Sequence, residues 1–165
     1  MDRVTLLEAL KAETQAVTAD LLLPVQMQKD DTEQPADRAA KVYLMRVPSG
    51  SSATKKVPYI LHQVITGKDE QPEGEEDEAR TTVRSIFAVY DDDEERGGLS
   101  LLNLMERVRI HLLQEVIIGN QFELDKQAGL EILVYPDDTA PFYMGEMASV
   151  WKCPAIERNV RRYLT

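Results

Sequence analysis

The sequence has little of several features that mark particular classes of protein. It contains one cysteine, Cys153, so no disulfide can form within the chain, which fits a reducing compartment such as the cytosol. Aromatic residues make up only 6% of the 165 residues, which leaves few side chains for stacking bases or sugars. No apolar run approaches the length of a membrane span, and the N-terminal residues lack the pattern of a secretory signal. We therefore expect a soluble protein of the cytosol.

Acidic residues outnumber basic ones, and the excess lies in two short tracts. The chain carries 29 acids against 19 lysines and arginines, a net charge of −10. Residues 68–79 hold seven acids and one lysine, and residues 91–96 hold five acids and one arginine. The rest of the chain is therefore neutral. Because these tracts repel phosphate, the composition argues against ordinary nucleic-acid binding, and the basic cluster Arg158, Arg161 and Arg162 is too small to reverse this.

Hydrophobic periodicity predicts two helices and five strands joined by polar turns. Helices are expected at residues 5–22 and 101–119, and strands at residues 41–47, 58–67, 80–90, 130–136 and 143–153. Thr5 and Glu8 have the spacing of a capping box at the start of the first helix. Ser100 can cap the second helix and Gly119 can end it.

This order, α-β-β-β-α-β-β, predicts a single α+β domain over residues 1–165 with two main helices. Its sheet is expected to be mostly antiparallel, with about five strands. Residues 24–40 read as a flexible linker, residues 48–56 as a flexible turn or long hairpin tip, and residues 154–165 as an arm or short helix. The two acidic tracts read as loops near residues 68–79 and 91–98.

The expected strands are apolar on both faces, so the sheet needs cover on both sides, from helices or from another subunit. In the second helix, one stripe of apolar residues is expected to face the core: Leu101, Leu104, Met105, Val108, Leu112 and Val116, widened by Leu102, Leu113 and Ile117. Ile110 lies almost opposite this stripe. One reading of Ile110 is an ordinary exposed side chain. The other is a contact with a partner, in which Ile110, Leu113, Ile117 and Ile86 would form an oligomer interface.

The acidic run Asp91, Asp92, Asp93, Glu94 and Glu95 has three possible roles: a metal site, a solvated loop, or a repulsive surface. A continuous strand over residues 80–90 would hold the two acidic tracts about 35 Å apart, too far to share one ion. The run also lacks the alternating acids and the sixth-position glycine of a calcium loop. A specific metal site is therefore the least favoured of the three roles.

The residues that commonly carry catalysis are few. His62 lies in an apolar strand, as a satisfied core histidine would, and His111 with Glu115 has the spacing of an ordinary surface pair. Cys153 has no neighbouring histidine in the sequence. No nucleophile elbow, phosphate-binding loop or dinucleotide fingerprint is present. We therefore expect no enzyme activity, no cofactor and no bound metal.

Two stretches nevertheless resemble a known family. The run TTVRSIFAVYDDDEERGGLSLLNLMERVRIHLL (residues 81–113) resembles a segment of small structural proteins of long-tailed phages and prophages. There a strand ending in Tyr-Asp precedes an acidic, Gly-containing loop and a helix beginning Leu-Leu-Asn-Leu-Met-Glu-Arg. The run FYMGEMASVWKCPAIER (residues 142–158) resembles the closing strand, with Gly145, Trp151, Pro154 and Arg158 in place. This chain has Gly-Gly-Leu-Ser where an aspartate would precede Leu-Leu, although Ser100 can still cap.

The resemblance implies a neck or tail-completion component similar to the tail terminators of long-tailed phages. Such a subunit forms a ring, expected as a hexamer, that caps the finished tail tube and joins it to the head-connector protein. DNA would pass without specific binding, with residues 91–95 at the channel or its rim. The protein would then reside in the virion, after assembly in the host cytoplasm. Two other classes stay open: a head-completion or connector neck protein, and a cytosolic acidic inhibitor or immunity-type binding module.

Overall fold

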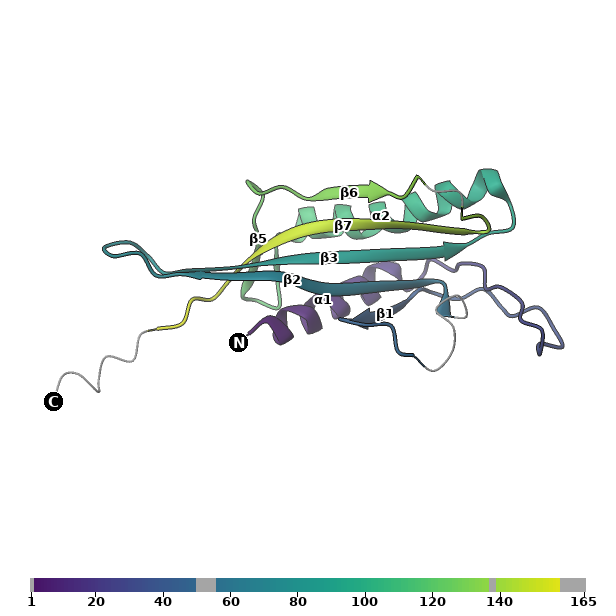
Figure 1. Ribbon diagram of the computed structural model, residues 1–165, viewed down its shortest axis with the longest axis horizontal. Helices are drawn as coiled ribbons and strands as arrows, with labels where there is room; N and C mark the ends of the chain where they lie inside the picture. Colours follow the sequence, from purple (N-terminus) through teal and green to yellow (C-terminus); the bar gives the residue numbers. More distant parts are fainter. Residues whose placement is uncertain (1, 50–55, 137–138, 158–165) are drawn as a thin grey trace.

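A computed structural model describes residues 2–49, 56–136 and 139–157 of the chain. These residues form two helices and seven strands (Figure 1). The elements in chain order are α1 (Arg3–Thr18), β1 (Lys41–Leu44), β2 (Tyr59–Glu70), β3 (Glu78–Tyr90), α2 (Glu94–Glu115), β4 (Ile117–Ile118), β5 (Phe122–Leu124), β6 (Glu131–Val134) and β7 (Phe142–Cys153). Asp2 is the N-cap of helix α1, and its side chain accepts a hydrogen bond from the amide of Thr5. The expected capping box at Thr5 and Glu8 was therefore wrong, because Asp2 caps the helix one turn earlier.

Strand β3 lies at the centre of one sheet with the strand order β1-β2-β3-β7-β5-β4. It pairs antiparallel with β2 on one side and with β7 on the other over nearly its whole length. The far edge of β7 pairs with β6 along one half and with β5 along the other. Only β1 runs parallel to its neighbour, β2.

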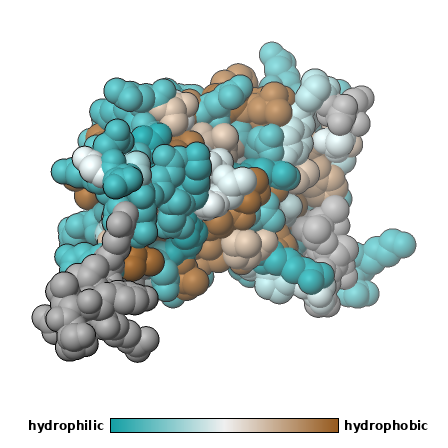
Figure 2. Space-filling model, turned by 60° about the vertical axis from the view of Figure 1, so that its left-hand side comes forward, coloured by the Kyte–Doolittle hydropathy of each residue, from teal (hydrophilic) through white to brown (hydrophobic). Residues whose placement is uncertain are grey.

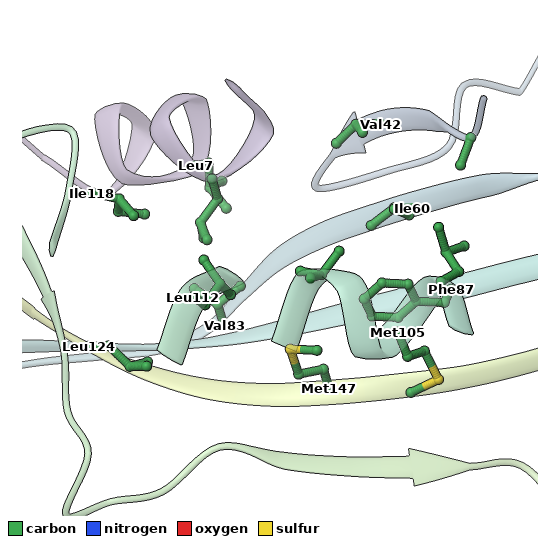
Figure 3. Close-up of a cluster of buried hydrophobic side chains, with 14 of the residues drawn as sticks. Leu7, Val42, Ile60, Val83, Phe87, Met105, Leu112, Ile118, Leu124 and Met147 are labelled. Atoms are coloured by element: carbon green, nitrogen blue, oxygen red, sulfur yellow. The ribbon is translucent and has the colours of Figure 1, made fainter. Parts of the chain in front are cut away.

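One face of this sheet is covered by the two helices, and the main core lies between the helices and this face. Helix α1 packs over β1 and β2, and α2 packs over β3 and β7. Alternation along β3 turns Val83 and Phe87 toward the helices, where they meet Met105 and Leu112 of α2 (Figure 3). Ile60, Met147 and Trp151 from the flanking strands are also fully buried in this cluster. The buried stripe of α2 is thus the stripe that the sequence predicts.

The α+β class and the two helices were predicted correctly, whereas the sheet was described only in part. It was expected to be mostly antiparallel with about five strands, and it is a mixed sheet of seven described strands in which β1 lies parallel to β2. A hairpin tip near residues 48–56 is therefore wrong, because a hairpin joins antiparallel strands. Residues 50–55 themselves lie outside the described parts. Strands β4 and β5 were missed, since two or three residues are too few to show a period of two.

Element ends also differ from the expected ones. Helix α2 begins at Glu94 rather than at residue 101, so most of the expected loop over residues 91–98 is helical. It ends before Val116, which has a positive φ of 63°, rather than at Gly119. Residues 24–40 contain no helix or strand, but Leu23 and Arg38 pair through two backbone hydrogen bonds of 2.8 and 3.0 Å. The arm expected at residues 154–165 is described only as far as residue 157, and Arg158, Arg161 and Arg162 lie outside that part.

The opposite face of the sheet, here called the helix-free face, carries a second and smaller apolar cluster. Its buried members are Val57, Tyr59, Leu61, Ala88 and Tyr90, and its partly buried members are Tyr43, Val47, Ile86, Phe142 and Met144. Among the described residues, no helix covers this cluster; the loop residues Val47 and Val57 pack against it from within the chain. The expectation of apolar side chains on both faces is thus met at one end of the sheet.

Two adjacent glycines at the start of α2 have opposite surroundings. A Cβ built on Gly97 would lie 2.1 Å from the ring of Tyr143 in β7, so only glycine allows this close approach. A Cβ built on Gly98 would meet nothing within 4 Å. Gly97 therefore permits α2 to lie against β7, whereas Gly98 has no such role.

We predict that Gly97→Ala lowers the free energy of unfolding by about 1–3 kcal/mol, because the Tyr143 ring must move. Gly98→Ala is the matched control: it should raise the free energy of unfolding by about 0.5–1 kcal/mol through helix propensity alone. Chemical denaturation of the two variants measures both changes. Equal stabilisation by the two substitutions would show that α2 does not lie against Tyr143.

Candidate interaction surfaces

The acidic run at residues 91–95 forms the start of α2 rather than a free loop. Asp93 is the N-cap, and its carboxylate accepts hydrogen bonds from the amides of Glu95 at 3.0 Å and Arg96 at 3.1 Å. Glu94 and Glu95 occupy the first turn, where negative charge is favourable beside the unpaired amides of the helix. Three of the five carboxylates are therefore placed where a helix N-terminus stabilises them.

Asp91 is buried, with only 1% of its surface exposed, and it pairs with an arginine on α2. The Arg96 guanidinium donates two bonds of 2.8 Å to the two carboxylate oxygens, and the amide of Asp93 donates a third at 3.0 Å. The hydrogen bonds from Arg96 hold the pKa of Asp91 below its ordinary value. The run is therefore not solvated throughout: Asp91 is buried, while Asp92, Asp93, Glu94 and Glu95 are exposed.

Tyr90 and Asp92 form a second local contact at this end of β3. The Tyr90 hydroxyl donates to the Asp92 carboxylate, and this hydrogen bond raises the pKa of Tyr90 to about 12. Asp91, Asp92 and Asp93 thus have local partners: a guanidinium, a tyrosine hydroxyl and helix amides. These contacts give the three aspartates roles in local folding.

The other acidic tract forms the end of the β2–β3 hairpin, here called the acidic hairpin (residues 68–79). The expected loop is wrong at both ends, because Lys68, Asp69 and Glu70 belong to β2, and Glu78 and Ala79 belong to β3. The hairpin reaches beyond the other described residues at one end of the molecule (Figure 1). Figure 2 turns this end toward the viewer, and its surface is mostly hydrophilic. The strand β3 is continuous between the two acidic tracts, so they do lie at its opposite ends.

The base of the acidic hairpin is tied to α1 by Arg3. Its guanidinium donates to Thr81 at 2.9 Å and to Asp69 at 3.0 Å, and it lies directly over Gly67. Two hollows beside the hairpin measure about 130 and 250 Å³, whereas ligand pockets typically measure about 300–1,000 Å³. The hairpin is therefore better suited to contact a macromolecule than to enclose a small molecule.

The four residues expected to form one interface lie on two separate surfaces. Ile110 is 44% exposed on the outer side of α2, and Ile117 is 55% exposed in β4, just beyond the end of that helix. Leu113 is partly buried against the main core. Ile86 points to the helix-free face of the sheet, so it lies on the side away from α2. The expected grouping is therefore divided between two opposite faces of the subunit.

The sequence analysis did not single out Leu99 and Leu102, which are 66% and 37% exposed on α2. Leu99 lay between the expected loop at residues 91–98 and the expected helix start at residue 101, and Leu102 was read as widening the core stripe. Had the aspartate at residue 93 been recognised as the N-cap, the expected helix would have included Leu99. The polar contacts of Arg84 on the helix-free face were missed as well. Its guanidinium lies 2.9 Å from the Glu146 carboxylate. That carboxylate also accepts a hydrogen bond of 3.1 Å from the Tyr135 hydroxyl.

A histidine and two hydroxyl groups are buried together beneath α1. The ring nitrogens of His62 are 2.9 Å from the Thr14 hydroxyl and 2.7 Å from the Ser85 hydroxyl. None of the His62 surface is exposed, and burial lowers its pKa to about 4. Because no substrate can reach this cluster in the folded state, the expectation of a satisfied core histidine is confirmed. His111 instead contacts Glu13 of α1, rather than the Glu115 suggested by spacing.

Within residues 2–49, 56–136 and 139–157, no group of three or more histidine, cysteine, aspartate or glutamate side chains has the arrangement of a metal site. No helix in the same part of the chain is long and apolar enough to span a membrane. No protein-family model matches the sequence, and no curated protein matches it either. The function is therefore argued from the surfaces described above.

We predict that Asp91→Asn lowers the free energy of unfolding by about 2 kcal/mol, because it replaces one of two buried acceptor oxygens with an NH₂ group that cannot accept from Arg96. Glu95→Gln is the control, since Glu95 is exposed in the same turn and its loss should cost only about 0.3–1 kcal/mol. Urea denaturation at neutral pH compares the two variants. Equal losses would show that the contact between Asp91 and Arg96 adds nothing to stability.

A second prediction concerns acid. His62 binds a proton at pH 6.5 in the unfolded chain but only near pH 4 in the folded protein. The unfolded state therefore holds more protons between these values, and stability must fall as the pH falls from 6.5 to 4. The histidine accounts for about 3 kcal/mol of this loss.

The measurement is the free energy of unfolding against pH for the native protein and for His62→Gln. The variant should have a shallower slope across this window, whatever its stability at neutral pH. His111→Gln is the control for the other histidine. An unchanged slope in His62→Gln would refute the assignment of the acid sensitivity to His62.

Proposed function

We propose that this protein is a structural component of a phage or prophage particle, a tail-completion ring of the tail-terminator kind. The observation that carries the proposal is the presence of two apolar surfaces on opposite faces of one subunit. One is the helix-free face, where Ile86 is partly buried at the edge of a buried apolar cluster, and the other is the outer side of α2, where Ile110 is exposed. A ring in which each subunit contacts the next requires two different surfaces, one for each neighbour.

The architecture supports the same proposal. An antiparallel hairpin that reaches beyond its own sheet gains little stability from its own chain, which suits an element that packs on a neighbour. The exposed acids Asp92, Glu94 and Glu95 are held at a helix start and would repel DNA phosphates near a channel or rim. Screening limits such repulsion to about 8 Å at physiological salt, so these residues would need to lie beside the DNA path.

In this proposal the ring, a hexamer, caps the tail tube protein on one side and meets the head-connector protein on the other. DNA passes through without specific binding, and the ring is part of the virion after assembly in the host cytoplasm. The related role of a head-completion or connector neck protein would use the same two surfaces. The acidic hairpin favours one further candidate, a binding module that covers a basic partner, because it carries seven acids and reaches beyond the rest of the sheet.

The proposal predicts the result of deleting the gene from the prophage or phage that encodes it. Without a cap, the tail tube has no defined end, so electron microscopy of induced lysates should show tails of variable length and heads without tails. The gene carrying Ile110→Asp should reproduce the defect in part, whereas Val4→Asp, at an exposed site on α1, should not. Complete particles of normal tail length after deletion would refute a role in tail completion. A basic protein co-purifying with a monomer would instead favour the binding module.

A further inference from the structure

Helix α2 carries a second apolar stripe on the side opposite the core. Its members are Leu99, Leu102, Ile110 and Leu113, which, together with Glu106, follow one another at intervals of three and four residues. Leu99, Leu102 and Ile110 are exposed, and Leu113, at the edge of the stripe, is partly buried against the main core. The inward side of the helix is already filled by Leu101, Leu104, Met105, Val108 and Leu112. This outer stripe is therefore a separate surface, with the spacing that helices use when they pack side by side.

An ion pair interrupts the outer stripe near its middle. The Arg109 guanidinium and the Glu106 carboxylate contact one another one turn apart, and each side chain is 32% exposed. Ile117, which is 55% exposed, continues the apolar surface just beyond the helix. The stripe thus has leucines toward each end and one charge of each sign near its centre.

This arrangement is complementary to itself when two copies run antiparallel. With the two-fold axis near residue 108, Leu102 meets Leu113 of the second copy and Leu99 meets its Ile117. Glu106 then lies opposite Arg109 of the second copy, and Ile110 lies beside the axis. A parallel pair would instead bring like charges together at Glu106 and at Arg109. It would also bring the acidic starts of the two helices together.

We propose that the free protein forms a two-fold dimer through antiparallel contact of the two α2 outer stripes. This inference goes beyond the proposed function and does not depend on it. Because the proposed ring also uses the outer side of α2, the dimer and the ring cannot form on the same subunit at once. The dimer would then withhold subunits from the ring until a tail end competes for this surface.

Charge exchange tests the dimer with its own internal control. Glu106→Arg and Arg109→Glu each place like charges across the axis, and each should weaken dimerisation by about tenfold. The double variant E106R/R109E restores opposite charges across the axis and should recover dimerisation. Sedimentation equilibrium over a range of protein concentrations gives the dissociation constants. Val4→Asp, at an exposed site on α1, is the matched control for an added surface charge.

Disulfide trapping tests the direction of the helices. In a Cys153→Ser background, Leu102→Cys protein mixed with Leu113→Cys protein should form a mixed disulfide dimer. Each variant alone should crosslink far less. Efficient crosslinking of Leu102→Cys with itself would indicate a parallel pair and overturn the antiparallel arrangement. The proposal would be overturned if the native protein stayed monomeric at every concentration, or if both charge reversals left dimerisation unchanged. The deletion experiment would still test the role in tail completion.

Discussion

The central constraint on this structure is the pairing of β3 along both of its edges. Its 13 residues bond to β2 and β7 over nearly their full length, so neither edge is free, and its two faces must have different surroundings. Val83 and Phe87 face the helices, while Ile86 and Tyr90 face away from them. Because the side chains alternate, a slip of one residue would place the core residues on the wrong face. The positions of the helices and of both apolar surfaces follow from this register.

Local folding requirements account for much of the unusual composition. Five consecutive carboxylates suggest a ligand site until their surroundings are known, but Asp93 is a helix cap, Asp91 is paired with Arg96, and Glu94 and Glu95 occupy a first helical turn. In the acidic hairpin, ion pairs join side chains instead: Asp69 contacts Arg3, Glu70 contacts Lys68 and Glu78 contacts Arg80. Two tracts that look alike in sequence therefore differ in structure, because one begins a helix and the other ends a hairpin.

Sequence reasoning succeeded where long periodic patterns decide the structure. The core stripe of α2, the continuous strand at β3, and the burial of His62 follow from spacing and apolar content alone. It failed where tertiary contacts decide. The parallel pairing of β1 with β2 has no local signature, and the start of α2 was placed seven residues late because its acids were read as a loop. The separation of Ile86 from Ile110 depends on which face α2 covers, which no local pattern reveals.

The position of β7 in the chain has a consequence for synthesis. This strand follows β3 by about 50 residues, yet it forms one of the two long ladders that β3 requires. At translation rates of about 5–20 residues per second, one edge of β3 stays unpaired for several seconds after it leaves the ribosome. An unpaired edge of a long apolar strand invites pairing with other chains. The nascent chain therefore passes through a stage in which this edge of β3 is open, because α2, which precedes β7, packs on a face of the strand and not on its edge.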